Sequence, residues 1–256
     1  MDLRLTFNED EVNYDAWRPS YVPELFEEII RYAGIDETKR ALEIGIGTGQ
    51  ATLPFLETGC QLTAIEIGKN MADYAKRKFA SFLNFQIVNI DFESYDTGDD
   101  TFDLIYSATA FHWISEEIGY KKVFDLLKSG GTVALFWNHP FVNRADDPLH
   151  LEIRKIYDRF KPSDPHPVEF DQRDCKKIIE RIHQYGFINC YSKVYYQTRS
   201  FTPEGYIALL NTYSDHRALP VDVKTGLESG IADAIRRFGG TLAVYDTMDL
   251  YLAQKP

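Results

Sequence analysis

The fold is decided by Ala41-Leu42-Glu43-Ile44-Gly45-Ile46-Gly47-Thr48-Gly49-Gln50-Ala51-Thr52. The apolar run at 41–44 predicts a strand, the three glycines predict a turn, and the residues from 51 onward continue as a helix. Glycine accepts positive φ angles and lets a ligand approach the backbone, and a helix N-terminus offers unpaired N–H groups. This order is typical of nucleotide-binding α/β proteins, although a tight strand-to-helix turn without a ligand shows the same pattern.

Glu43 stands two residues before Gly45, and its carboxylate narrows the choice of ligand. It would repel the phosphates of a dinucleotide, whereas it suits a ligand that carries positive charge. S-adenosylmethionine carries a sulfonium and an ammonium group and has no phosphate. The stretch resembles the first motif of class I S-adenosylmethionine-dependent methyltransferases, an acidic residue followed by Gly-x-Gly-x-Gly. The resemblance extends over about the first 140 residues, and it implies S-adenosyl-L-methionine as cofactor, bound at Glu43, Gly45, Gly47 and Gly49.

A second carboxylate, Glu66, ends the apolar stretch 61–66 and lies 17 residues beyond Gly49. An acidic residue at this place can accept hydrogen bonds from both ribose hydroxyls of an adenosine ligand, and Ile67 can then lie against the adenine face. An NAD site has the same requirement, so Glu66 supports an adenosine ligand without choosing between the two cofactors. A solvated acid at a strand end is the alternative without a ligand.

Further cofactor contacts follow from the resemblance. In the family, an Asp after the third strand binds the adenine amino group and the next residue frames the ring; Asp91 and Phe92 stand at this place. A Tyr-x-x-x-Arg-Pro lead folds over the cofactor in many small-molecule members, and its arginine reaches the cofactor carboxylate. Tyr14 and Arg18 match this lead. An Asp that only caps a turn, and a lead packed by chance on the surface, are the alternatives.

Strands and helices alternate along the chain. Strands are predicted at 41–44, 61–66, 85–88, 102–107, 132–138, 187–198 and 241–252, helices at 24–32, 52–57, 70–80, 117–127, 149–160, 174–186, 200–211 and 221–238, and a turn at 97–100. Alternation of this kind requires parallel strands with crossover helices. We predict a Rossmann-like, doubly wound α/β fold with a mostly parallel seven-stranded sheet and helical cap insertions; the resemblance implies that the last strand is antiparallel.

The chain is predicted to form one methyltransferase domain over 1–256, with a cofactor-binding core and an N-terminal lid in 1–138. Segments 139–170 and 199–240 are predicted as cap elements that contact the substrate; the first is longer than the median loop of about 4–6 residues. Ligands in such sheets bind beyond the carboxyl ends of the strands. The polar residues at or near these predicted ends are Glu43, Glu66, Asp91, Ser107 and Asn138. Ser107 therefore joins the predicted cofactor-binding residues.

The composition of the chain limits which kinds of partner it is expected to bind. The net charge of −11 disfavours nucleic acid, because binding to a phosphate backbone needs a basic face. No apolar run approaches the roughly 18 residues of a membrane span, and no signal peptide is recognisable. Cys60, Cys175 and Cys190 have neither metal-ligand nor disulfide-framework spacing, so they indicate reduced thiols. We expect a cytoplasmic monomer or weak homodimer that binds neither membrane nor metal.

The methyl acceptor is predicted to be a small organic molecule that is methylated on oxygen. Phe111-His112-Trp113 follows the fourth predicted strand, where substrate would meet the methyl group, and it resembles the segment of methyltransferases that act on small acids such as trans-aconitate. His112 is the candidate catalytic base, because neutral histidine takes up a proton near pH 7. Its alternative is a packing role beside Trp113. We expect Arg144, Arg199 or Arg217 to hold an acceptor carboxylate.

Two other classes of function share parts of this pattern. One is an NAD-dependent oxidoreductase, which Glu43 and the Gly-x-Gly-x-Gly spacing disfavour. The other is a protein that binds the cofactor without turnover. The complete set of polar residues at the strand ends argues against the second alternative.

Overall fold

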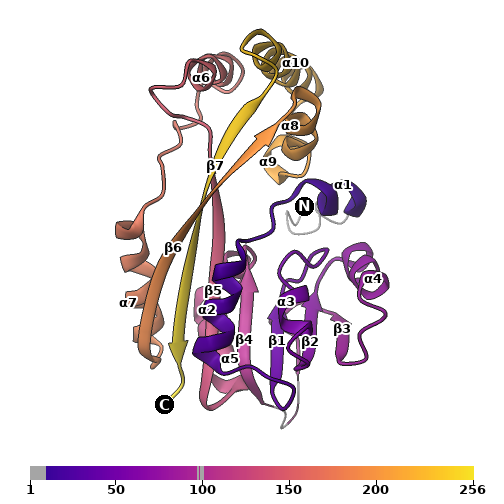
Figure 1. Cartoon of the computed structure of the whole chain (residues 1–256), viewed down its shortest axis with the longest axis vertical. Coiled ribbons are helices and arrows are strands. Elements are labelled where there is room, and N and C mark those ends of the chain that lie inside the picture. Colours follow the sequence, from indigo (N-terminus) through magenta and orange to yellow (C-terminus); the bar gives the residue numbers. More distant parts are fainter. Residues whose placement is uncertain (1–9, 97, 99–100) are drawn as a thin grey trace.

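One seven-stranded sheet forms the centre of the protein in the computed structural model, which describes residues 10–96, 98 and 101–256 (Figure 1). Its order is β3-β2-β1-β4-β5-β7-β6. The strands are β1 Arg40–Ile44, β2 Gln61–Glu66, β3 Phe85–Asn89, β4 Phe102–Ala108, β5 Leu127–Phe141, β6 Ile188–Phe201 and β7 Leu242–Gln254. The first five pair in parallel, whereas β7 pairs antiparallel with β5 and β6. The predicted sheet is therefore confirmed, including its antiparallel last strand.

Helices cover both faces of this sheet. Successive residues of β1 point to opposite faces, so that Ala41 packs with one hydrophobic cluster and Leu42 with the other. The helices are α1 Glu11–Trp17, α2 Pro23–Ala33, α3 Leu53–Leu56, α4 Lys69–Lys78, η2 Phe111–Trp113, α5 Glu116–Leu126, α6 Pro148–Phe160, η3 Gln172–Cys175, α7 Lys176–Gln184, α8 Pro203–Leu210, α9 Ser214–Arg217 and α10 Val221–Arg237. Residues of α2 and α3 belong to the first cluster and residues of α5 and α7 to the second, so the fold is doubly wound.

A third hydrophobic cluster lies beyond the carboxyl ends of the parallel strands. It joins residues of α6, α8 and α10 to Phe201 of β6 and to Leu242 and Val244 of β7. Figure 1 shows these helices above the sheet, carried there by the long strands β5, β6 and β7. All three strands exceed their predicted lengths. β5 is longer at both ends, residues 199–201 of β6 pair with 242–244 of β7, and residues 253–254 of β7 pair with 132–133 of β5.

Three α-helices depart from the sequence-based prediction. The segment from 11 to 17 forms α1, although it has no apolar stripe and contributes no buried residue. Its contacts are tertiary: Asp10 caps Asn13 N–H at 3.2 Å, and Asn13 Nδ2 donates to the Ala208 carbonyl of α8 at 3.1 Å. Four residues of a predicted loop form α9, and the helix after the glycine turn has only four residues. The predicted turn at 97–100 lies largely outside the described residues.

Candidate functional site

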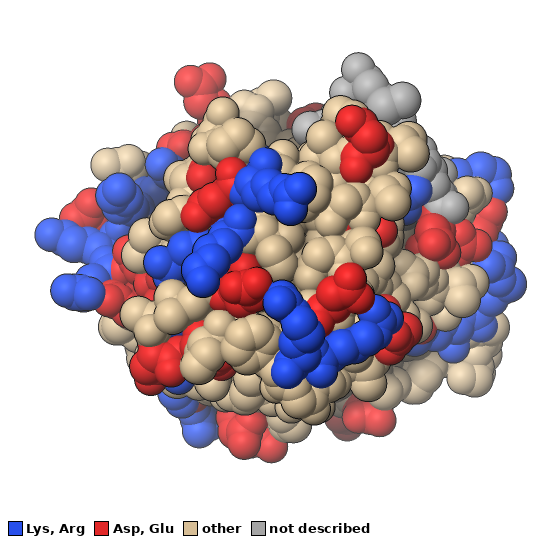
Figure 2. Space-filling model, turned by 90° about the horizontal axis from the view of Figure 1, so that it is seen from above, with Lys and Arg blue, Asp and Glu red and all other residues tan. Residues whose placement is uncertain are grey.

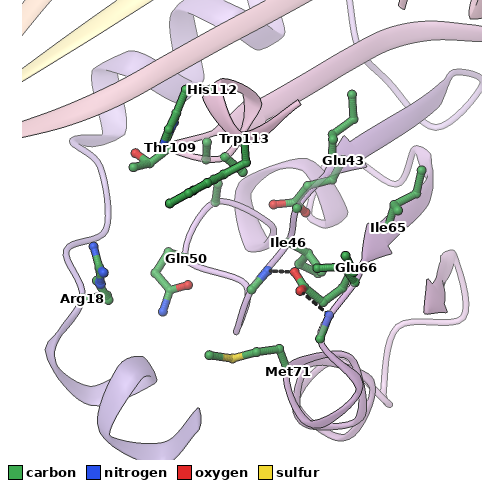
Figure 3. A pocket seen from close by; sticks show the side chains of 18 of the residues that line it. Arg18, Glu43, Ile46, Gln50, Ile65, Glu66, Met71, Thr109, His112 and Trp113 are labelled. Carbon is green, nitrogen blue, oxygen red and sulfur yellow. Dashed lines mark hydrogen bonds between the residues drawn. The ribbon is translucent and has the colours of Figure 1, made fainter. Parts of the chain in front are cut away.

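A cavity of about 300 Å³ opens at the carboxyl ends of the parallel strands, and residues of α1 and α9 also line it (Figure 3). Its wall contains all of the predicted site residues except Gly49 and Ser107. The predicted residues in the wall are Tyr14, Arg18, Glu43, Gly45, Gly47, Glu66, Ile67, Asp91, Phe92 and His112. The structure thus brings together in one cavity residues that are far apart in the chain.

The glycine turn forms one wall with bare backbone. Gly45 and Gly47 have φ angles of 71° and 58°, in the left-handed region that side chains rarely adopt. A Cβ atom on Gly45 would lie 2.5 Å from the Cβ atom of Ala110. These positions require glycine, and they leave the backbone open to a ligand.

Gly49 and Ser107 lie behind the cavity and not in its wall. A Cβ atom on Gly49 would lie 2.3 Å from the ring of Phe79, so this glycine lets α4 pack against the turn. Ser107 is buried, and its hydroxyl donates to the Ile44 carbonyl at 2.9 Å, which ties β4 to β1. Gly49 belongs to the glycine motif and Ser107 lies near the end of β4, but both residues contact the core and not the cavity.

Glu66 clamps the two turns that flank it. Oε2 accepts the Gly47 N–H at 2.9 Å and Oε1 accepts the Gly68 N–H at 2.8 Å (Figure 3). Burial raises the pKa of Glu66, while the backbone hydrogen bonds act in the opposite direction. The carboxylate lies in the cavity wall with lone pairs left for a hydroxyl-bearing ligand.

Glu43 is a buried carboxyl group at the inner end of the cavity. Its Oε2 accepts the Thr52 hydroxyl at 2.8 Å and the Tyr106 hydroxyl at 2.9 Å. Burial raises the pKa of Glu43 to about 8, so the group holds its proton at neutral pH in the empty protein. A positive charge in the cavity would favour the ionised form.

The part of the cavity beyond Glu66 is mostly apolar. Ile65, Met71 and Phe92 line it, and Ile67 stands beside them. Asp91 is at its edge, where Oδ1 accepts the Ser94 N–H at 2.8 Å and so also caps a turn. Apolar walls with one carboxylate at the rim suit a flat base that carries an amino group.

Arg18 connects the lead to the cap. Its Nη2 donates to the Thr212 carbonyl at 2.7 Å, and its guanidinium lies 4.9 Å from the ring centroid of Tyr14 and 4.3 Å from that of Tyr213. On the other side of α1, Asp15 accepts from Lys78 Nζ at 2.7 Å and from the Tyr74 hydroxyl at 2.8 Å. These contacts fix α1 across the opening of the cavity.

His112 forms a hydrogen bond that the sequence did not indicate. The indole Nε1–H of Trp137 donates to Nδ1 of His112 at 3.0 Å. Partial burial lowers the pKa of His112, and the neighbouring His139 lowers it further. His112 is therefore neutral near pH 7, with its hydrogen on Nε2, because Nδ1 is the acceptor for Trp137.

Sequence reasoning missed two residues of the wall, Tyr21 and Thr109, whereas it indicated Asn138 as a polar residue at a strand end. Tyr21 and Thr109 lie in the cavity and share a hydrogen bond of 2.6 Å between their hydroxyl oxygens. Asn138 lies there too, with its Nδ2 donating to Asp246 Oδ1 at 3.0 Å. Thr109 is a threonine with a φ angle of 52°, and such strain in a β-branched residue is typical of functional sites. A threonine after a strand and a tyrosine before a helix carry no recognisable signal by themselves.

The three arginines expected to hold an acceptor carboxylate lie elsewhere. Arg199 forms a two-pronged pair with the buried Asp246. Arg144 pairs with Glu169 at 3.3 Å and lies over the Tyr245 ring. Arg217 lines a separate groove between α1, α8 and α10. Of the described arginines, Arg18 alone lines the cavity.

The charges of the wall fit a cationic adenosine ligand. Five carboxyl groups line it, with Arg18 as the one lysine or arginine among the described residues of the wall; they are those of Glu43, Glu66, Asp91, Glu93 and Asp215. The ionised carboxylates of this wall repel phosphate, and Glu43 favours a sulfonium because a positive charge beside it promotes its ionisation. Arg18 can meet a single carboxylate. The residues present therefore fit S-adenosylmethionine and disfavour NAD.

Comparison with known proteins points in the same direction. A family model described as a methyltransferase domain matches residues 41–131. Two uncharacterised proteins of Schizosaccharomyces pombe are similar to the chain: a methyltransferase that is 24% identical and a methyltransferase-like protein that is 28% identical. The first alignment covers 90% of this chain and 87% of the relative, and the second covers 100% and 98%.

A solved structure shares the fold. It is a Haemonchus contortus phosphoethanolamine N-methyltransferase in complex with S-adenosylhomocysteine, similar with a TM-score of 0.55 and 17% identity over 97% of this chain and 57% of that one. In the described part of the chain, no helix has the length and apolar character needed to cross a membrane.

Proposed function

We propose that this chain, a class I S-adenosylmethionine-dependent methyltransferase, methylates a small organic acid on a carboxylate oxygen. The observation that carries the proposal is the hydrogen bond from Trp137 Nε1 to His112 Nδ1 at 3.0 Å. This hydrogen bond decides whether the site can deprotonate the nucleophile, and hence which class of acceptor it can methylate.

The bond to Trp137 favours a role for His112 as a donor and not as a base. Neutral His112 carries its hydrogen on Nε2, and Nδ1 could take a proton only by losing the Trp137 bond. A nucleophile that needs deprotonation would find no free basic nitrogen here. A carboxylate is already ionised at neutral pH and needs only positioning, which the Nε2–H of His112 can supply.

The bound cofactor supplies an activated methyl group on sulfur, which an in-line nucleophile can displace. The protein contributes orientation and exclusion of water. Arg18, Tyr14 and Tyr213 cover the opening, and Trp113 and Ile114 add apolar surface next to His112. The cavity volume of about 300 Å³ limits the size of the acceptor that can bind beside the cofactor, so the acceptor must be compact.

Surface charge supports a small acceptor over a nucleic acid. Figure 2 shows the cap from above, with blue and red side chains interspersed and not gathered into one basic area. Between the cap helices, Arg237 pairs with Glu152 at 2.9 Å and Arg236 with Glu204 at 2.8 Å. With a net charge of −11, such a surface offers little attraction for a phosphate backbone.

The same proposal assigns a role to each segment of the chain. We assign the cofactor-binding core and N-terminal lid to 1–138, and we assign substrate contacts to the cap segments 139–170 and 199–240. Pro140, Tyr213 and Asp215 from these segments line the cavity, which supports the assignment. Three free cysteines suit a cytoplasmic protein, and we propose a monomer or weak homodimer.

The test is a methylation screen with S-adenosylmethionine labelled on the methyl group. Small acids, phenols, tRNA and peptides are offered separately, and label is expected in small acids as base-labile methyl esters. Label in tRNA or peptide, and in no small molecule, would overturn the proposal.

The role of His112 is tested with the acid that is methylated best. His112→Ala is expected to lower kcat/KM by about 10- to 100-fold, as the loss of one hydrogen bond to a charged group does. His112→Gln keeps an N–H donor and should recover part of this loss. With the wild type, kcat/KM should not fall as the pH is lowered from 8 through the depressed pKa of His112, because the protonated ring still donates. Glu43 also titrates in this range, so a fall that the wild type shows and His112→Gln does not show would establish His112 as a base.

A further inference from the structure

We propose that the hydroxyl groups of Tyr21 and Thr109 act as one hydrogen-bond donor to the carboxylate of the methyl acceptor. The inference rests on the proposed function and assigns the second contact of that carboxylate beside His112. It replaces the arginine that the sequence led us to expect.

The pair occupies a fixed position in the cavity wall. Tyr21 OH and Thr109 Oγ1 are 2.6 Å apart, and both residues line the cavity. The Tyr21 ring packs edge-to-face on Phe136, with ring centroids 4.8 Å apart and planes at 84°. Thr109 donates its backbone N–H to the Phe136 carbonyl at 2.8 Å. Phe136 therefore holds both partners in place.

Thr109 is held in an unfavourable backbone conformation at this point. Its φ angle is 52°, and its Oγ1 accepts the backbone N–H of Asn138 at 3.3 Å. A β-branched residue in the left-handed region persists only where the surrounding contacts outweigh the strain. The hydroxyl is thus directed by a bond on each side, from Tyr21 and from Asn138.

The two hydroxyl groups carry two hydrogens, and only one of them is used in the hydrogen bond between Tyr21 and Thr109. Burial raises the pKa of Tyr21, so both hydroxyls keep their hydrogens at any working pH. One of the two hydrogens makes the bond between them, whichever residue donates. Within the described part of the chain no acceptor contacts the other hydrogen, so a ligand in the cavity can take it.

His112 lines the same cavity and supplies a second donor. Thr109 and His112 are on the same short connection after β4, and Figure 3 shows their side chains next to each other at one side of the cavity. A carboxylate has two oxygens and accepts one hydrogen bond on each from two such donors. Both donors are neutral, so they orient an anion without an arginine in a wall that is rich in carboxyl groups.

The test is a double-mutant cycle with Tyr21→Phe and Thr109→Val. Each single variant leaves one hydroxyl with its hydrogen, so KM for the best acid from the methylation screen should rise less than about fivefold. The double variant has no hydroxyl left, and its KM should rise at least about tenfold more than the product of the single effects. Thr109→Ser keeps the hydroxyl and should behave like the wild type.

Binding is measured independently of turnover. Benzoate and trans-aconitate are titrated into the complex of each variant with S-adenosylhomocysteine, and the methyl ester of each acid serves as the uncharged control. The double variant should lose discrimination between acid and ester while it retains affinity for S-adenosylhomocysteine, which also shows that it is folded.

Additive effects of the two substitutions, or an unchanged KM in the double variant, would overturn the inference and leave the proposed function standing. A wild-type protein that methylates phenols and no acid would overturn both.

Discussion

Glu43 shows how one residue couples ligand preference to stability. The protein buries this carboxyl group with hydrogen bonds from Thr52 and Tyr106, and no lysine or arginine of the described residues forms an ion pair with it. Its pKa is about 8 in the folded protein and 4.5 as an unperturbed group. The folded state therefore holds a proton that the unfolded state releases between these values.

Stability should fall as the pH rises through this window. The contribution of Glu43 is fully present below pH 4.5 and is lost progressively as the pH approaches 8, because the unfolded state binds fewer protons there. Glu43→Gln cannot ionise and keeps an acceptor oxygen for Thr52 and Tyr106. It should therefore be more stable than the wild type at pH 7.5, by on the order of 3 kcal/mol.

Urea unfolding at pH 5 and pH 7.5 measures this difference, which should nearly vanish at pH 5. Glu57→Gln, at an exposed glutamate, is the matched control and should change little at either pH. A Glu43→Gln variant that is destabilised equally at both values would show that Glu43 is ionised in the folded protein.

At the scale of elements, α1 is the part of the site with the least support of its own. None of its residues is buried, and its position depends on contacts with α4, α8 and the cap. Segments held by few buried contacts open locally at low free energy. A ligand that reaches Tyr14 and Arg18 adds contacts to this helix.

Hydrogen exchange followed by mass spectrometry should show this directly. Amides of 11–18 are expected to exchange faster than those of β1 in the empty protein and to slow when S-adenosylhomocysteine is added. Asp15→Asn removes the charge that contacts Lys78 and should speed their exchange further. Asp73→Asn, in a surface pair on α4 with Lys69, is the control. Exchange in 11–18 that is the same with and without the ligand would contradict the role of α1 as a cover.

At the scale of the whole molecule, the cavity depends on the complete fold. Its wall contains residues from Tyr14 to Asp215, contributed by the lead, the strand ends and the cap. An unfolded chain cannot offer this wall, so a ligand that binds there stabilises the folded state by mass action.

S-adenosylhomocysteine at about 100 times its Kd should add about 2.7 kcal/mol to the free energy of unfolding. For a chain of this size, each kcal/mol raises Tm by about 2–4 °C, so a shift of about 5–10 °C is expected. Differential scanning fluorimetry measures it, with NADH as the control that should give no shift. An equal shift with NADH would contradict the discrimination that we attribute to the carboxyl groups of the wall.

The sequence by itself determined the sheet and much of the cofactor side of the cavity. Strand and helix periods are local properties, so the parallel strands and their crossover helices were predictable. Glu43, Glu66 and Asp91 met in one cavity because parallel strands end at the same edge of a sheet. The helix α1 was missed, since its residues have no amphipathic pattern and tertiary contacts hold it.

Only the tertiary structure decided which side chains face one another. The sequence placed Ser107 among the ligand contacts, but in the folded protein its hydroxyl bonds to Ile44 in the core. It placed His112 as a base, whereas the structure brings Trp137 onto its Nδ1. Tyr21 and Thr109, 88 positions apart, meet at 2.6 Å. Such pairs depend on the register and packing of several elements at once, and no local period of the chain encodes them.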